Sequence, residues 1–202
     1  MGIVYSDISV SADGFATGLN QREEAPFGDI DESWLHSWMF DAYAENSAEV
    51  DAIVDSGATI MGRNMFGPVR GEWDRDWRGW WGPNPPFHTP VFVLTHHPRP
   101  SIDMEGGTVF HFVDADPQEA LDLAREAAGD LDVRIGGGAE TIRQYLEAGA
   151  IDELHIAVSP VLLGAGEPLW RGLDLPALGY ALAETTAGER ATHLRIVRKD
   201  RQ

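Results

Sequence analysis

The hydrophobic residues of the chain fall into short runs that are separated by turn-forming residues. The first run covers Ile3 to Val10, with apolar residues at 3, 4, 5, 8 and 10, and predicts a mostly buried strand. Similar runs predict strands at 58–61, 91–94, 108–113, 132–135 and 152–158. Two late strands, near 180–186 and 192–198, flank a short turn and are expected to pair as an antiparallel hairpin.

Helical spacing appears between several of these strands. A helix is predicted from Asp31 or Ser33 to about Val50, and its apolar face would carry Trp34, Leu35, Trp38, Met39 and Tyr43. Further helices are predicted at 117–128 and at about 139–148. Strands that alternate with helices predict an α/β fold with a largely parallel sheet and helices on both faces. The antiparallel end of the chain makes this sheet mixed.

Two polar segments, 17–30 and 67–90, are too long for simple connections and are predicted to be binding loops. The second contains Trp73, Trp77, Trp80 and Trp81. Such aromatic area can wall a pocket for a flat heterocycle, form a small satellite core or make a dimer contact. The sequence does not distinguish these three alternatives.

Charge and composition narrow the possible partners. The chain has 202 residues, with 15 basic and 33 acidic side chains and a net charge of −18. Nucleic acid and anionic membranes are therefore not expected as partners. Cysteine is absent, which excludes disulfides, thiolate metal sites and thiol nucleophiles. The sequence shows no signal peptide and no membrane span, so we expect one domain over residues 1–202 in a soluble, cytoplasmic protein.

The clearest candidate for ligand binding is the segment Gly136-Gly137-Gly138, which joins a predicted strand to a predicted helix. Glycines let a ligand approach the backbone, and the N–H groups of a helix start can bind an anion. The alternative interpretation is a tight strand-to-helix turn. Arg63 and the pair Thr95-His96 also follow buried strands, where α/β proteins bind ligands. Arginine suits phosphate, and the alternative interpretation of Arg63 is a solvated or ion-paired side chain.

Acid–base candidates are Asp13, which follows the first strand, and Asp31 and Glu32, which open the first helix. Carboxylates at a helix start are usually caps, which is the alternative for the last two. The histidines show no metal-ligand spacing, so no metal site is expected. No serine-hydrolase elbow or P-loop is present.

Six short motifs occur in an order that resembles dihydrofolate-reductase-like proteins. The closest resemblance is to the reductase domain at the C-terminus of the bifunctional riboflavin-biosynthesis deaminase-reductase, and to its stand-alone relatives. It extends over about residues 3 to 198. The motifs are Ser11-Ala12-Asp13-Gly14, Met61-Gly62-Arg63, Val93-Leu94-Thr95, Ile135-Gly136-Gly137-Gly138, Ile151-Asp152-Glu153-Leu154 and Pro160-Val161-Leu162-Leu163-Gly164-Ala165-Gly166.

The resemblance implies a three-layer fold on a mixed, mostly parallel sheet of about eight strands, and a reductase that uses NADPH. It places the cofactor against Ala16, Thr17, Gly62, Arg63, Asn64, Thr95, His96, Gly136, Gly137, Gly138, Ala139, Glu140 and Thr141. In this hypothesis Arg63, with Thr95 or His96, selects the 2′-phosphate. The side chains expected to wall the substrate are Trp34, Trp38, Phe66 and Trp81.

Two departures from the family pattern concern the substrate. Ile135 stands where the riboflavin enzyme usually has a glutamate that contacts substrate, and Asp7 stands in place of a basic residue. A deaminase zinc site would need cysteines, so only the reductase half is expected.

The resulting hypothesis is hydride transfer from NADPH to a small heterocyclic or ribosyl substrate, of the 5-amino-6-(5-phosphoribosylamino)uracil reductase type. The alternatives are a dihydrofolate or other pterin reductase, a non-catalytic NADP-binding sensor, and a dimeric interaction protein. A homodimer is expected, because the late hairpin offers edge strands to a partner.

Overall fold

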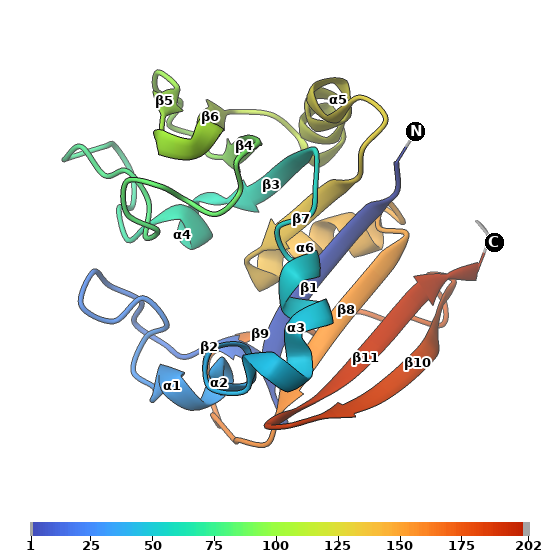
Figure 1. Cartoon of the computed structure of the whole chain (residues 1–202). Helices are drawn as coiled ribbons and strands as arrows, with labels where there is room; N and C mark the ends of the chain where they lie inside the picture. Colours follow the sequence, from blue (N-terminus) through green and yellow to red (C-terminus); the bar gives the residue numbers. More distant parts are fainter. Residues whose placement is uncertain (1, 200–202) are drawn as a thin grey trace.

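A nine-stranded mixed sheet forms the centre of the computed structural model (Figure 1), which describes residues 2–199 apart from the side chains of Glu32 and Ser33. The strand order is β10-β11-β8-β1-β7-β3-β4-β6-β5. The strands are β1 (Val4–Ser11), β3 (Ala58–Gly62), β4 (Pro90–Leu94), β5 (Ile102–Asp103), β6 (Val109–Val113), β7 (Val133–Gly137), β8 (Glu153–Ser159), β10 (Tyr180–Gly188) and β11 (Ala191–Arg198). A separate small sheet pairs β2 (Phe15–Thr17) with β9 (Glu167–Pro168).

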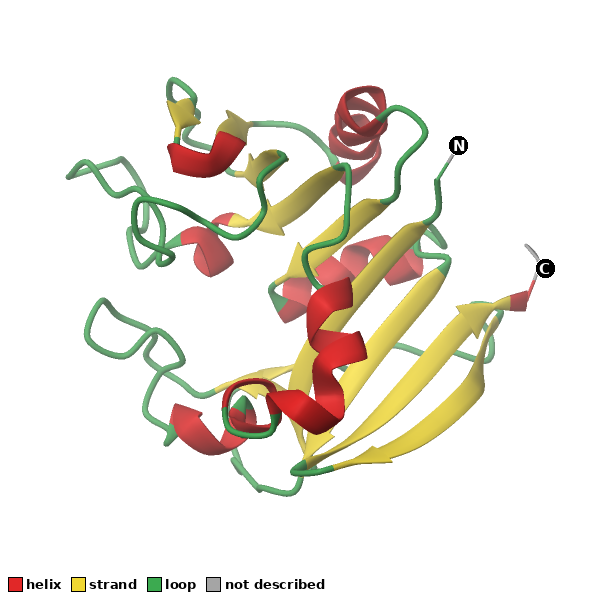
Figure 2. Cartoon of the chain, in the orientation of Figure 1, coloured by secondary structure: helices red, strands yellow, loops and turns green. Residues whose placement is uncertain are grey.

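The pairing of the strands confirms the predicted fold class. The strands from β8 through β1, β7, β3 and β4 to β6 run parallel, and β10 and β11 close one end as an antiparallel hairpin. The ninth strand, beyond the eight or so expected, is the two-residue edge strand β5. Helices cover both faces: α3 (Tyr43–Ala52) lies in front of the sheet in Figure 2, and α6 (Ala139–Glu147) lies behind it.

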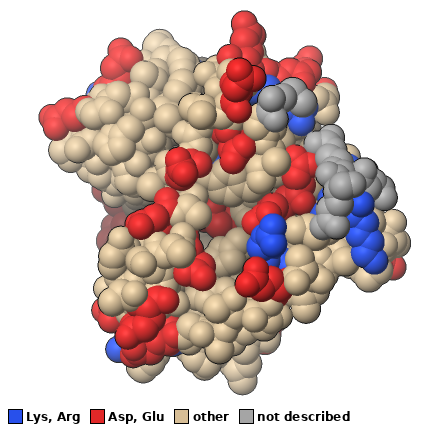
Figure 3. Space-filling model, turned by 45° about the vertical axis from the view of Figure 1, so that its right-hand side comes forward, with Lys and Arg blue, Asp and Glu red and all other residues tan. Residues whose placement is uncertain are grey.

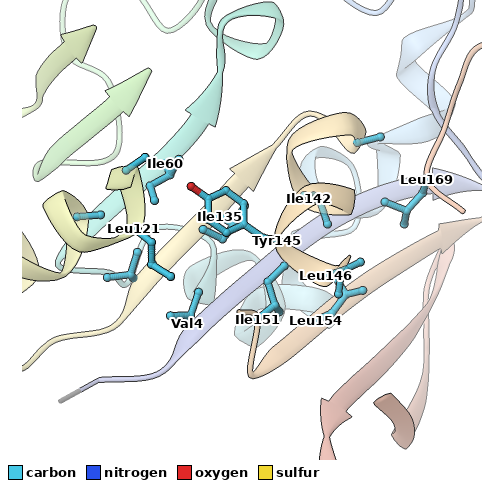
Figure 4. Packing of buried hydrophobic residues seen from close by; sticks show 14 of the residues in the cluster. Val4, Ile60, Leu121, Ile135, Ile142, Tyr145, Leu146, Ile151, Leu154 and Leu169 are labelled. Carbon is cyan, nitrogen blue, oxygen red and sulfur yellow. The ribbon is translucent and has the colours of Figure 1, made fainter. Parts of the chain in front are cut away.

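The main core lies between the sheet and the helices on its rear face (Figure 4). Ile60 and Ile135 of the sheet contribute to the same buried cluster as Leu121 of α5 (Pro117–Ala128) and Ile142 of α6. Each such side chain, when fully buried, contributes about 1.5–3 kcal/mol of transfer free energy. Helix α5 begins as its sequence predicts, because Asp116 accepts from the backbone of residues 118 and 119 in a capping box.

The tryptophan-rich loop forms a satellite core, one of its three predicted roles. Trp73, Trp77 and Trp81 pack against a second buried cluster that includes Phe66 and Phe110. The indole of Trp81 stacks on Phe110 at a centroid distance of 6.0 Å. In this structure the aromatic rings of this loop therefore serve mainly to cover the β3–β4–β6 part of the sheet.

The single long helix predicted from about residue 31 to 50 is wrong. The structure has three short helices there, α1 (Glu32–Leu35), α2 (Ser37–Phe40) and α3. Asn46 has non-helical dihedrals inside α3, and its buried amide nitrogen donates to the carbonyls of Trp38 and Ala42 at 3.1 and 2.7 Å. An asparagine side chain that bonds the backbone in this way competes with helix continuation. The pattern of apolar positions did not reveal this competition.

The predicted C-terminal hairpin is confirmed, and its outer strand β10 is exposed over most of its length. An exposed edge strand can pair with another chain, and the homodimer stays a prediction on this ground. Acidic side chains are spread over the face shown in Figure 3, in keeping with the net charge. No helix among residues 2–199 is long and apolar enough to cross a membrane.

Candidate functional site

The carboxyl ends of β1, β7, β3 and β4 meet at one edge of the sheet. Met61 pairs with Gly137 across β3 and β7, and Gly62 pairs with Leu94 across β3 and β4. The glycine turn after β7, Arg63 after β3 and Thr95 after β4 therefore lie side by side. Open α/β sheets bind ligands at this edge, so the topology assembles the candidate site that the sequence predicts from three separate segments.

The glycine turn leaves space for a ligand next to the start of α6. Gly137 has a φ of +115°, a region that favours glycine, and the Gly137–Gly138 peptide is cis. A Cβ on Gly138 would meet nothing within 4 Å, whereas one on Gly62 would lie 2.5 Å from Oγ1 of Thr141. Gly138 is the N-cap of α6 and provides no side-chain hydrogen bond to it. Helix α6 thus begins without a capping side chain, next to the open space at Gly138.

Arg63 presents an unused hydrogen-bonding edge at this site. Its Nη1 donates to Oγ1 of Thr95 at 3.2 Å, which fixes one side of the guanidinium. Nε and Nη2, the two donors of the opposite side, are buried and have no hydrogen-bond partner among the described residues. Desolvation lowers the pKa of Arg63 from its ordinary value, but an arginine stays charged in proteins. This pair of donors is the fork that binds a phosphate or carboxylate in a bidentate manner.

Two neighbours of Arg63 were missed by the sequence reasoning. Its guanidinium carbon lies 3.9 Å from the ring centroid of Trp73, and that of Arg99 lies 4.0 Å from the same centroid. Desolvation is also the main cause that lowers the pKa of Arg99, and the charge of Arg63 lowers it further. Arg99 lies only five residues beyond the end of β4, so its position near that strand end is a signal that could have identified it.

The structure separates the two residues that were paired with Arg63. Thr95 contacts the guanidinium, as described above. The His96 side chain is 94% exposed, and its Nδ1 lies 2.9 Å from the Asp114 carboxylate. Asn64 is exposed as well. In this structure Thr95 and not His96 is therefore the partner of Arg63.

The geometry assigns Asp13 a different role from the predicted acid. Its carboxylate accepts from Oγ of Ser11 at 2.6 Å and from the backbone N–H groups of Leu163 and Gly164 at 3.1 and 2.7 Å. The hydrogen bond from Ser11, followed by the two backbone bonds, lowers the pKa of Asp13 although slight desolvation acts in the opposite direction. An ionised, fully engaged carboxylate is a poor proton donor, so Asp13 holds the loop after β8 against the turn after β1.

The structure does not show the other residues predicted for the nicotinamide side in contact with Arg63 or the glycine turn. Ala16 is buried in β2, and Thr17 pairs with Glu167 of β9. Asp31 is exposed just before α1, and the side chain of Glu32 lies outside the described part of the structure. These assignments stay predictions.

Two of the four predicted substrate-wall residues are core residues. Trp38 is buried, and its Nε1 donates to Oγ of Ser9 at 2.9 Å; Phe66 is fully buried in the second cluster. Neither ring lines an open surface, so in this structure neither forms the wall of a pocket, and these two predictions are not supported. The amphipathic pattern predicts that an aromatic residue lies on an inner face. It does not predict whether that residue lines a pocket or belongs to the core. Trp81 belongs to the second cluster, and Trp34 alone is largely exposed, at 55%.

A separate hollow of about 260 Å³ lies on the face of the sheet beneath α3, between Tyr5, Asp7 and Glu49 on one side and the hairpin on the other. Nε2 of His155 lies 2.9 Å from Nδ1 of His193, whose Nε2 lies 2.8 Å from Oδ1 of Asn46. The Asn46 oxygen must accept, so His193 donates through Nε2, and with a neutral His193 its Nδ1 accepts from Nε2 of His155. Because none of its lining residues is a predicted site residue, this hollow is distinct from the site at the strand ends.

The chain matches the family model of the RibD C-terminal domain over residues 3–194. Among solved structures it is similar to a putative riboflavin biosynthesis protein from Shewanella sp. PV-4, at 22% identity and a TM-score of 0.59. That similarity covers 98% of this chain and 99% of the other. No curated protein matches the chain.

Two further solved structures show the same fold in longer chains. One is the diaminohydroxyphosphoribosylaminopyrimidine deaminase/5-amino-6-(5-phosphoribosylamino)uracil reductase of Thermotoga maritima, at 13% identity and a TM-score of 0.59. The other is RibD of Acinetobacter baumannii, at 16% identity and a TM-score of 0.57. Each similarity covers 98% of this chain, which spans 56% and 58% of these longer proteins.

Proposed function

Because the chain belongs to the RibD C-terminal domain family, we propose that it is an NADPH-dependent reductase that acts on a small heterocyclic or ribosyl substrate. The observation that carries this proposal is the fork of Arg63, whose Nε and Nη2 have no partner among the described residues, next to the glycine turn. Both features suit the phosphates of a dinucleotide, and both lie at the sheet edge where such cofactors bind. When bound, NADPH would supply the hydride.

The residues of the chain fit this cofactor in two places. The open space at Gly138 and the uncapped N–H groups of α6 would receive the pyrophosphate. The Nε and Nη2 donors of Arg63, which lack an acceptor in the described structure, would receive the 2′-phosphate. Thr95 would orient the guanidinium through its hydrogen bond, so that little side-chain entropy is lost on binding. Asp13 would keep the loops on the nicotinamide side in place. The contribution of the protein is then mainly positioning.

For the substrate, the riboflavin-pathway pyrimidine is the first candidate and a pterin is the second. The second rests on Ile135, a fully buried apolar residue where the riboflavin enzymes usually have a glutamate that contacts substrate. A side chain with no exposed area cannot bind a substrate polar group, so any substrate here must be recognised elsewhere in the cleft.

The first test is a titration of the wild-type protein with NADPH and with NADH, monitored by tryptophan fluorescence. The second test measures oxidation of the cofactor in the presence of each candidate substrate. Loss of the Arg63 fork removes two charge-assisted hydrogen bonds worth about 1.5–3 kcal/mol each, so Arg63→Gln should weaken NADPH binding by at least about 100-fold. NADH binding should change little. Arg75→Gln is the matched control, because Arg75 is an exposed arginine of the tryptophan-rich loop, paired with Glu23.

Equal weakening of both cofactors by Arg63→Gln would contradict the 2′-phosphate assignment. Binding of NADPH without oxidation by any of these substrates would favour the sensor alternative over a reductase. No binding of either cofactor to the wild-type protein would refute the proposed function.

A further inference from the structure

Trp73 covers the arginine that the proposed cofactor site requires. Its indole centroid lies 3.9 Å from the guanidinium carbon of Arg63. The Nε and Nη2 donors of that guanidinium are buried. A phosphate must reach these two donors to form the bidentate contact. Some of the groups that cover these donors must therefore move before an anion binds, and the indole is one that contacts the guanidinium directly.

Arg99 contacts the same indole. Its guanidinium carbon lies 4.0 Å from the Trp73 centroid, so the two guanidinium carbons are no more than about 8 Å apart. Charge-assisted hydrogen bonds of about 2.8 Å on two sides of a phosphate bridge a comparable gap. Nε of Arg99 is also buried without a partner among the described residues, while its Nη2 donates to the Trp77 carbonyl.

The two like charges are balanced in part by carboxylates, since Glu72 acts on Arg63 and Asp76 acts on Arg99, and the contacts of Trp73 add to this. A cation over an indole gains about 0.5–2 kcal/mol, which offsets part of the repulsion and desolvation of each guanidinium. Nε1 of Trp73 donates to the His97 carbonyl at 2.6 Å, and this bond holds the ring in place. The indole thus stabilises the positions of the Arg63 and Arg99 guanidinium groups, which a bound phosphate would stabilise once the indole has moved.

We propose that Trp73 is a gate at the anion site: its indole holds Arg63 and Arg99 in the free protein and is displaced by the 2′-phosphate, with Arg99 then acting as the second cation. This inference rests on the proposed function, because it assigns residues of the same site. The purely structural alternative is that Trp73 only closes the second cluster, where its ring lies 5.3 Å from that of Phe112 and 6.1 Å from that of Phe66. In that case the indole stays in place when a ligand binds.

The test uses 2′,5′-ADP and ADP as probes, because they differ in the 2′-phosphate and need no hydride transfer. Calorimetry gives the affinities, stopped flow gives the association rates, and the indole N–H resonance of Trp73, assigned by its loss in Trp73→Phe, reports the position of the ring. Arg99→Gln should weaken 2′,5′-ADP by about tenfold and change ADP by less than about twofold.

Trp73→Phe keeps an aromatic ring in the cluster but covers the fork less, so 2′,5′-ADP should associate faster with it than with the wild type. Trp80→Phe is the control, since Trp80 lies in the same loop and its ring contacts that of Trp77 at 4.6 Å. It should leave both affinities and rates unchanged. The Trp73 resonance of the wild type should shift with 2′,5′-ADP and not with ADP.

The possible results separate the gate from the proposed function. NADPH binding with no effect of Arg99→Gln, and with an unshifted Trp73 resonance, refutes the gate and leaves the proposed function standing. Binding of 2′,5′-ADP only after Trp73→Phe supports the gate but removes NADPH as the cofactor of the wild-type protein. No binding of 2′,5′-ADP to either protein refutes both.

Discussion

The ion pair between Asp7 and Arg134 gives a stability prediction that does not depend on function. The two guanidinium donors Nε and Nη2 of Arg134 bind the two carboxylate oxygens of Asp7 at 2.6 and 2.7 Å, between the neighbouring strands β1 and β7. The side chains are only 4% and 11% exposed. Burial alone lowers the pKa of Arg134, but the charge and hydrogen bonds of Asp7 outweigh it and raise that pKa. Each of the two buried charges is therefore stabilised by the other.

The perturbation is Asp7→Asn, which keeps the shape and removes the charge. It leaves a buried guanidinium without its counter-charge, a change that costs about 3–5 kcal/mol. For a chain of this length each kcal/mol corresponds to roughly 2–4 °C, so Tm should fall by roughly 6–20 °C. Urea unfolding followed by circular dichroism measures the free energy directly.

Two controls separate the buried charge from the loss of any ion pair. In Asp7→Asn with Arg134→Met no unpaired charge remains, so the double variant should be more stable than Asp7→Asn alone. Glu153→Gln removes an ion pair with the half-exposed Arg195, at 2.8 Å, and should cost no more than about 1 kcal/mol. A loss below about 1 kcal/mol for Asp7→Asn, or no recovery in the double variant, would refute this reasoning.

Three further predictions follow from particular contacts. Gly138→Ala should leave Tm nearly unchanged, because its Cβ enters open space, but it should weaken NADPH binding, because that space is the proposed pyrophosphate site. Gly137→Ala should lower the free energy of unfolding by about 1–3 kcal/mol, because Gly137 has a positive φ, and thermal unfolding measures this loss. Burial is the main cause that lowers the pKa of His155 and of His193, so the unfolded chain takes up protons first as pH falls. The free energy of unfolding should therefore decrease below about pH 6.5, with a slope of up to about 1.4 kcal/mol per pH unit for each histidine, and a variant with both changed to glutamine should show a flatter profile in pH-dependent melts. Asp13→Ala should raise proteolytic cleavage in the loop after β8, while Asp13→Asn should retain part of the protection; equal cleavage of wild type and Asp13→Ala would contradict the anchoring role.

Local patterns in the sequence determined the elements on which the site is built. The alternation of apolar runs and turns identified the parallel strands and the final hairpin, because burial and turn geometry act over a few residues. The capping box of α5 and the glycine turn before α6 are local as well. Since parallel strands share one edge for their carboxyl ends, the sequence was enough to place Arg63, Thr95 and Gly138 at the same edge, and the strand order β7-β3-β4 brought them side by side.

Contacts between residues far apart in the chain were decided only by the tertiary structure. Asp7 and Arg134 are 127 positions apart, and no pattern in either segment indicates that the two charges cancel. Asn46 contacts His193, 147 positions away, through its Oδ1, and Trp38 became a core residue because α2 packs it against the sheet. The contact of both Arg63 and Arg99 with the indole of Trp73 likewise needs three segments to converge. Periodicity and turn chemistry specify what each segment becomes, whereas ion pairs, cation–π contacts and burial depend on which distant segments share a surface, and that is set by the packing of the whole chain.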